Sequence, residues 1–336
     1  MTTAEIRALF SPDLESIYLD AATYGLPPGP TVAALDRALR EWQAGTAVIE
    51  VDWEPAGEAC RALFAELIGA APGDVALIPT VSIGVGMVAA SLPEGAEVLV
   101  PEDEFTSVVL PFLAAAARGV TVREVPWLDL AAGIRDETAL VAFSLTRAQS
   151  GETADLGAVC AAARAHGCRV LVDSTHATPF VEVADHLARI DYLVCHAYKH
   201  LLSPRGVGFL YVHADARESL TPYFANWRTS GRSYGDPLST APGMSPFDVS
   251  LAWQAWVGAR ESLALLVQWR REGALDSVLG LSRRLATGLE VRHGGASLVC
   301  VPVADPERAA TALGAAGIRC AARGGFIRLS PHVYNT

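Results

Sequence analysis

The segment CHAYKHLLSPRGVGFLYV, residues 195–212, places a lysine between an apolar strand and a glycine-bearing turn. A lysine ammonium is costly to bury, so a lysine buried at this point is expected to have a chemical role. The flanking runs DYLVCHAY and GVGFLYV are short and apolar, which predicts a strand on each side of the turn. The segment therefore predicts a core strand that ends at Lys199.

Strand and helix patterns alternate around this segment, over residues 60–215. Runs such as DVALIPT, EVLVPED, TALVAFSLT and RVLVDST predict strands, and EACRALFAELIGA, SIGVGMVAASL and DLGAVCAAARAHG predict helices between them. This alternation is typical of an α/β fold with a mostly parallel sheet flanked by helices. Such sheets bind ligands at the carboxyl ends of their strands.

The remaining sequence predicts a second, smaller domain. Residues 221–249 are rich in Gly, Pro, Ser, Thr and Tyr, which predicts a long functional loop, and a long helix follows at about 249–272. Helix and strand patterns then alternate to the end of the chain. We predict a large domain over 12–245 and a small α+β domain over 246–336, joined by the long helix, with residues 1–11 packing near it.

Composition narrows the class of protein. The 336 residues are 51% hydrophobic and 19% charged with a net charge of −11 and no basic run, which argues against nucleic acid and membrane partners. The N-terminus lacks the pattern of a secretory signal, and the apolar runs are broken by Pro and Gly. Six scattered cysteines without a CxxC pair favour a reduced, cytoplasmic protein, and no metal-binding motif is present.

Two charged residues follow neighbouring strands of the predicted sheet. RVLVD ends in Asp173, and Lys199 follows DYLVCHAY about two dozen residues later. Residues just past the ends of adjacent parallel strands converge on one crevice. Asp173 and Lys199 are therefore expected either to form an ion pair or to hold a cofactor between them.

The order of motifs resembles fold-type-I pyridoxal phosphate (PLP) enzymes of the class V aminotransferase superfamily, which includes cysteine desulfurases, kynureninases and isopenicillin-epimerase-like proteins. The motifs that carry the resemblance are YLDAATYGLPP, DEFTS, SGETADL, VDSTH with HAYKHLLSPRGVGFLYV, MSPFDVSLAWQAWVGA and RGGFIRLSPHVYNT. They cover nearly the whole chain. The resemblance implies a fold-type-I α/β structure with PLP as cofactor.

The resemblance also implies roles for the residues around the cofactor. Lys199 would form the Schiff base and move protons at the substrate Cα. Asp173 would pair with the pyridinium nitrogen, His176 with the phenolic oxygen, and Phe105 would stack on the ring. The alternatives at these two positions are a satisfied polar neighbour for His176 and a core residue for Phe105.

The phosphate of such a cofactor needs hydrogen-bond donors and a helix N-terminus. PTVSIGVG supplies both at a strand-to-helix turn, although Ser82 alone could be an ordinary helix cap. The predicted phosphate contacts are Thr80, Val81, Ser82, His196 and Tyr198, together with Ser250, which the resemblance directs to the phosphate of the partner subunit. The resemblance therefore implies a homodimer with shared active sites.

The carboxylate of an amino-acid substrate is best bound by arginine, which offers two parallel donors. Arg328 matches the carboxylate arginine of kynureninase-like and aminotransferase-like members, and Arg323 resembles the one used by desulfurases. We favour Arg328. Tyr24 is expected either to line the substrate pocket or to be a structural aromatic residue, and His200 and the arginines at 147, 228 and 232 are equally readable as surface charges.

The function predicted first is a PLP-dependent transformation of a small amino acid through an external aldimine, by C–S or β-lyase or by aminotransferase chemistry, with specialised metabolism as one setting. Active desulfurases carry a cysteine shortly after the RxG turn, where this chain has GGFIRLSP, so a persulfide-forming desulfurase is disfavoured. An epimerase or racemase of the same superfamily and a non-catalytic PLP-fold binding module remain alternatives. A nucleotide-binding α/β protein is disfavoured because neither GxGxxG after a first strand nor GxxxxGK[ST] is present.

Overall fold

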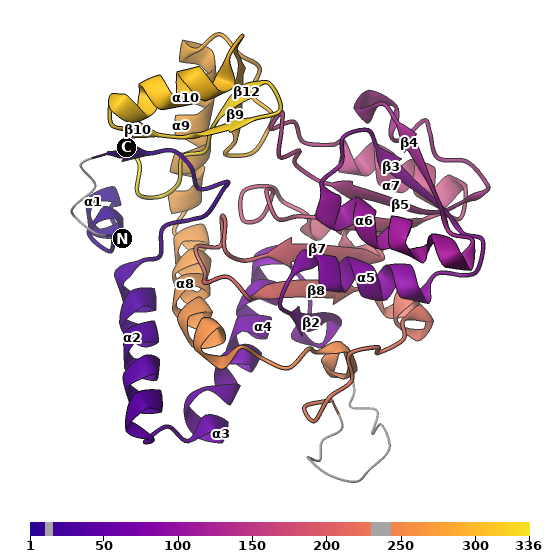
Figure 1. The fold of residues 1–336 in the computed structure, drawn as a ribbon, viewed down its shortest axis with the longest axis horizontal. Helices are drawn as coiled ribbons and strands as arrows, with labels where there is room; N and C mark the ends of the chain where they lie inside the picture. Colours follow the sequence, from indigo (N-terminus) through magenta and orange to yellow (C-terminus); the bar gives the residue numbers. More distant parts are fainter. Residues whose placement is uncertain (11–15, 230–242) are drawn as a thin grey trace.

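The computed structural model describes residues 1–10, 16–229 and 243–336. The predicted loop at 221–249 lies partly outside these residues. A large domain carries the central sheet, and a smaller group of helices and strands packs beside one end of it (Figure 1). The two chain termini lie close to this smaller group. No helix of the described part of the chain is long and apolar enough to cross a membrane.

The central sheet has seven strands in the order β2-β8-β7-β6-β5-β3-β4. Their bounds are β2 Val75–Ile78, β3 Glu97–Pro101, β4 Thr121–Val125, β5 Thr138–Ser144, β6 Arg169–Asp173, β7 Tyr192–His196 and β8 Gly208–Val212. Only β8 runs antiparallel to its neighbours. Gly208 sits where this strand is squeezed between two others, since a Cβ there would lie 3.1 Å from the carbonyl oxygen of Cys195. The mostly parallel sheet predicted from the sequence is confirmed.

Helices cover both faces of the sheet, each over its own hydrophobic cluster (Figure 1). Helices α5 Val81–Ser91 and α6 Thr106–Ala114 pack on one face, where Val85, Val88 and Phe112 are buried. Helices α4 Glu54–Ile68, α7 Leu156–Ala165 and α8 Trp253–Arg271 pack on the other, around Phe64 and Trp256. This arrangement explains why the buried strands read as continuous apolar runs.

Three further helices lie near α8 or α4. They are α1 Thr3–Arg7, α2 Gly29–Ala44 and α3 Ile49–Asp52. Helix α2 begins with a proline in its first turn and ends at Gly45, which adopts the left-handed conformation that glycine tolerates best. The sequence analysis did not identify α2, although both of its end signals are present.

The small group contains α9 Ala274–Gly288, β9 Val299–Pro302, α10 Pro306–Ala315, β10 Ile318–Arg319, β11 Ala321–Arg323 and β12 Phe326–Leu329. Strands β9, β11 and β12 form an antiparallel sheet. Strand β1 Ile17–Tyr18 pairs with β10, so residues near the N-terminus join this group. Asp20 also forms a bridge with Ser330, which brings the segment after β1 beside the end of β12.

Candidate active site

The carboxyl ends of the central parallel strands bring polar residues together. Ser144 at the end of β5 is paired in register with Asp173 at the end of β6, and Asp173 is paired with Val194 of β7. The Thr175 hydroxyl accepts the backbone N–H of His196 at 3.0 Å, which ties the turn after β6 to the end of β7. The backbone of the sheet therefore fixes the spacing of these side chains.

A cavity of about 150 Å³ opens at these strand ends. Nine residues predicted to contact the cofactor line it: Thr80, Val81, Ser82, Phe105, Asp173, His176, His196, Tyr198 and Lys199. Four other residues complete the lining: Ser107, Ser144, Thr175 and Arg205. Ser144 and Thr175 were missed, although each lies at or just after a strand end and the same rule that selected Asp173 could have found them.

Lys199 is buried and directed into this cavity. Its Nζ lies 2.9 Å from Nε2 of His176 and 5.3 Å from the centre of the Phe105 ring. Burial lowers the pKa of the Lys199 amine to about 8, and the nearby carboxylate of Asp173 opposes this shift. An amine with this pKa exists partly in its free, nucleophilic form near neutral pH.

Asp173 is also buried, and its Oδ1 accepts the backbone N–H of Thr175 at 2.9 Å. Burial raises the pKa of the Asp173 carboxyl, while the bonds from Thr175 and the charge of Lys199 lower it. A carboxylate in such surroundings is stabilised most by a cationic hydrogen-bond donor.

The first turn of α5 faces the same cavity. Thr80 is the residue before the helix, and its hydroxyl lies 3.0 Å from the hydroxyl of Ser82. The first N–H groups of a helix have no partner within the helix and attract anions. This end of the cavity therefore suits an anionic group.

A second cavity of about 270 Å³ shares Phe105, Tyr198 and Lys199 with the first. Its other lining residues are Ala22, Thr23, Ala148, Gln149, Arg323, Gly324 and Arg328. Lys199 therefore lies where the two cavities meet. We call the first the inner cavity and the second the outer cavity.

Arg328 on β12 is the buried cation of the outer cavity. Its Nη2 donates to the hydroxyl of Thr23 at 2.7 Å and its Nη1 to the carbonyl of Ala148 at 3.2 Å. Its Nε has no hydrogen-bond partner in the described part of the chain. Its Nη2 lies 4.0 Å from a carboxylate oxygen of Asp20. Burial lowers the pKa of Arg328, so this guanidinium gains from any further anion that enters the cavity.

Three other predicted residues take different positions. Arg323 also lines the outer cavity but is exposed, and its Nη1 donates to the carbonyl of Ala322. Tyr24 and Ser250 are not among the described residues that line either cavity. The Tyr24 carbonyl instead accepts a hydrogen bond from the hydroxyl of Tyr18, and Ser250 is exposed. Their roles stay predictions.

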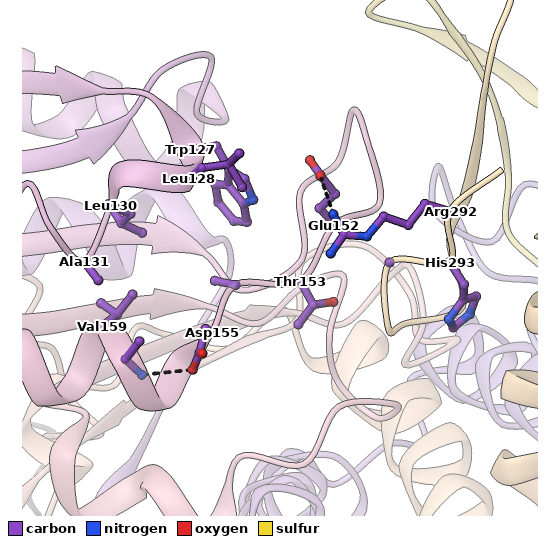
Figure 2. A pocket seen from close by; sticks show the side chains of 13 residues that line it. Trp127, Leu128, Leu130, Ala131, Glu152, Thr153, Asp155, Val159, Arg292 and His293 are labelled. Atoms are coloured by element: carbon purple, nitrogen blue, oxygen red, sulfur yellow. Dashed lines mark hydrogen bonds and ion pairs between the residues drawn. The ribbon is translucent and has the colours of Figure 1, made fainter.

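A hairpin at residues 146–153 connects the outer cavity to both parts of the fold. Gln149 bonds the carbonyl of Asp103, and Thr153 donates its N–H to the carbonyl of Gly294 in the small group. The opposite flank of the hairpin faces a separate cavity of about 380 Å³, in which Glu152 lies between Trp127 and Arg292 (Figure 2). The motif SGETADL begins in this hairpin, but no contact with the small group was predicted for it.

Gly25 presses against the backbone that carries Lys199. Its N–H donates to the carbonyl of Tyr198 at 2.9 Å, and a Cβ at this position would overlap the carbonyl oxygen of Lys199 and lie 2.5 Å from Cδ2 of Leu202. We expect Gly25→Ala to lower the free energy of unfolding by about 1–3 kcal/mol, because the added methyl group overpacks this contact. Chemical denaturation measures this loss.

Gly280→Ala is the matched control for that experiment. A Cβ on Gly280 in α9 would meet nothing within 4 Å, so alanine there is expected to stabilise the protein by up to about 1 kcal/mol through helix propensity. Equal stability of the Gly25→Ala variant and the unmodified protein would contradict the close contact with Lys199.

The chain is similar in sequence and in fold to several known proteins. A family model described as aminotransferase class-V matches residues 17–335. The uncharacterized aminotransferase YcbU of Bacillus subtilis is 26% identical over 322 residues, which cover 90% of this chain and 86% of that protein. The isopenicillin N epimerase of Streptomyces clavuligerus is 31% identical over 198 residues, 54% of this chain and 48% of the epimerase.

Among solved structures, the cystine C–S lyase C-DES in complex with cysteine persulfide superimposes with a TM-score of 0.85 and 24% sequence identity. The match covers 96% of this chain and 94% of the lyase chain. A likeness of this kind confirms the predicted fold.

Proposed function

This chain belongs to the aminotransferase class-V family, and on that premise we propose that Lys199 binds pyridoxal phosphate (PLP) and that Arg328 binds the carboxylate of a small amino acid. As a member of this family, the protein is a PLP-dependent enzyme with lyase or aminotransferase chemistry. The observation that carries the proposal is the position of Lys199. It is the only lysine among the 336 residues, and it is buried where the inner and outer cavities meet.

The residues of the inner cavity fit PLP. The buried Asp173 carboxylate calls for a cationic donor, which a protonated pyridine nitrogen supplies. The first turn of α5, with the hydroxyls of Thr80 and Ser82, suits a phosphate. His176 also lines this cavity, and its Nε2 lies 2.9 Å from Nζ of Lys199, so a polar ring stands beside the proposed attachment point. The inner cavity therefore offers a carboxylate for the pyridine nitrogen of PLP, a helix start for its phosphate and an amine for its aldehyde.

When bound, PLP supplies an aldehyde that links to amines and a ring that withdraws electrons from the substrate Cα. Asp173 would keep the ring nitrogen protonated and so maintain that withdrawal. The Lys199 amine, with its pKa lowered by burial, would take a proton from Cα and return it. Arg328 would orient the substrate by holding its carboxylate in the outer cavity, beside Lys199.

Among the reactions open to this site, we place a C–S or β-lyase first. The segment after Arg323 contains no cysteine, so this chain has no residue there to accept sulfur in the manner of a desulfurase. An aminotransferase is the second candidate, favoured by the match to YcbU over 90% of the chain.

Product analysis separates these two activities. A lyase releases pyruvate and ammonia from a small β-substituted amino acid without any added keto acid. An aminotransferase needs a keto acid and converts it to an amino acid. Consumption of the β-substituted amino acid only when a keto acid is supplied, with its β-substituent retained and no ammonia released, would contradict the lyase assignment.

A homodimer with shared active sites is part of the proposal. Ser250 is exposed and lies outside the cavities of its own chain, which is consistent with a contact to a partner's phosphate. Sedimentation equilibrium tests the dimer, and Ser250→Ala should weaken PLP binding if the contact exists. A cytoplasmic location is also proposed, from the use of cysteine: all six are free thiols in the structure.

The rate of PLP uptake is expected to depend on pH through the protonation state of the Lys199 amine. Only the free amine adds to the aldehyde, and the pKa of Lys199 is about 8 rather than 10.5. We expect the rate of PLP uptake by cofactor-free protein to rise with pH and to level off above a midpoint near pH 8. Stopped-flow absorbance measures this rate, and a midpoint above pH 10 would show that Lys199 is not held in a desolvated site.

A further inference from the structure

Three imidazole rings form a buried column behind Lys199. We call His176, His200 and His332 the imidazole column. The rings of His176 and His200 lie 5.7 Å apart at 70°, and those of His200 and His332 lie 6.1 Å apart and nearly parallel. All three residues are buried, and His200 and His332 are fully shielded from solvent. Nε2 of His176, the first ring of the column, lies 2.9 Å from Nζ of Lys199.

The far end of the column is fixed by the backbone. Nδ1 of His332 accepts the N–H of Val333 at 2.9 Å, so the ring proton of neutral His332 is on Nε2. This Nε2 lies 3.0 Å from the carbonyl oxygen of His200 and donates to it. Burial lowers the pKa of His332 to about 4, which keeps the ring neutral. Both nitrogens of His332 are therefore satisfied.

His200 differs from both neighbours, because neither of its ring nitrogens has a hydrogen-bond partner among the residues that the structure describes. The ring contacts the Phe180 ring edge-to-face at 5.5 Å. Each unsatisfied buried polar atom costs about 1–3 kcal/mol, and a phenyl ring would fill this space without that cost. An imidazole at this position therefore costs stability, which suggests that its nitrogens are used in some state of the site.

His176 has one nitrogen engaged and one free. Its Nε2 faces Nζ of Lys199 at 2.9 Å, and its buried Nδ1 has no partner. For Nε2 of a neutral ring to accept from Lys199, the ring proton must be on Nδ1. That proton needs an acceptor, and the adjacent His200 ring carries two unused nitrogens. The χ2 torsion of histidine is broad, so the two rings can turn toward each other within their present contact.

We propose that His200 is a positioning residue: it accepts the Nδ1–H of His176 and thereby keeps Nε2 of His176 as the acceptor that faces Lys199. The pair stays neutral, and no proton leaves either ring. The inference rests on the proposed role of Lys199. Other charged or titratable groups act on the Lys199 amine as well: Asp173, Cys195, His196, Tyr198, Arg323 and Arg328.

The test measures the titration of Lys199 without using PLP. The full-length chain, freed of cofactor, is acetylated with trace acetic anhydride across a pH series, and mass spectrometry measures acetylation of the only lysine. His200→Phe keeps a ring but removes both nitrogens. When His200 no longer accepts the Nδ1–H, the His176 ring can turn an N–H toward Lys199. An N–H donates to a neutral amine but not to an ammonium, so this change favours the free amine of Lys199. We expect the midpoint pH of Lys199 acetylation to fall by about one unit, which corresponds to the free energy of one ordinary hydrogen bond.

Three further variants separate polarity from packing. His200→Gln retains an acceptor and is expected to keep the midpoint of the unmodified protein. Phe180→Leu disturbs the packing of the same ring without removing a polar atom and is expected to leave the midpoint unchanged. His200→Leu repeats the apolar test if His200→Phe does not fold. We also expect His200→Phe to unfold at no lower denaturant concentration than the unmodified protein.

An unchanged midpoint in both apolar variants would overturn the inference, as would an equal fall in Phe180→Leu. The labelling result is independent of the proposed function. If the expected shift is found in a chain that takes up no PLP, the proposed function fails while the role of His200 stands. If PLP binds but the midpoint does not move, only the role of His200 fails.

Discussion

Lys199→Ala is expected to abolish turnover while the fold survives. The substitution removes the proposed attachment point of PLP and the group that moves protons at the substrate Cα, so kcat should fall by about 10⁴-fold or more. No other lysine in the chain can take over either role. Product formation by the reconstituted protein with excess PLP measures this loss.

Stability provides the control for Lys199→Ala. The amine is buried with its pKa lowered, so its removal is expected to leave the thermal unfolding midpoint within a few degrees of that of the unmodified protein. Turnover by folded Lys199→Ala within tenfold of the unmodified protein would remove Lys199 from its role.

Arg328→Ala is expected to weaken amino-acid binding strongly. Loss of one partner of a buried charge pair costs about 2–5 kcal/mol. At about 1.4 kcal/mol per tenfold change, this is roughly 30- to 4,000-fold in Kd. The shift of the PLP absorption band on titration with the amino acid measures Kd directly.

Arg323→Ala is the matched control, since Arg323 lines the same outer cavity but is exposed. An exposed charge contributes about 0–1 kcal/mol to a contact, so less than about a tenfold loss is expected. Arg328→Lys keeps the charge but not the paired donors, so its loss of amino-acid affinity is expected to lie between those of Arg328→Ala and Arg323→Ala. A larger loss in Arg323→Ala than in Arg328→Ala would assign the carboxylate to Arg323.

The strand-end rule explains how much of the site could be predicted from sequence. Alternating apolar runs located β6 and β7, and the residues that follow them, Asp173 and Lys199, line one cavity. The same reasoning selected Thr80 and Ser82 at the start of α5. These are local features, in which a strand or helix boundary alone decides where the side chain points.

The missed features depend on contacts between distant parts of the chain. The sequence left His200 open as a surface charge, because a position just past a strand end does not show which side chains cover it. In the structure it lies beside His332, 132 residues away along the chain. Gly25 contacts the backbone of Lys199 in the same long-range manner. The sequence did contain one signal that was overlooked, since a chain with a single lysine already directs attention to Lys199.

The most direct test of the account is borohydride reduction of the PLP-loaded protein followed by peptide mapping. Because the chain has one lysine, reduction can fix the cofactor at only one side chain. We predict a yellow absorption band that borohydride bleaches, with the mass of reduced PLP found on the peptide that contains Lys199. A protein that takes up no PLP, or that carries it only on its terminal amine, would contradict the central claim.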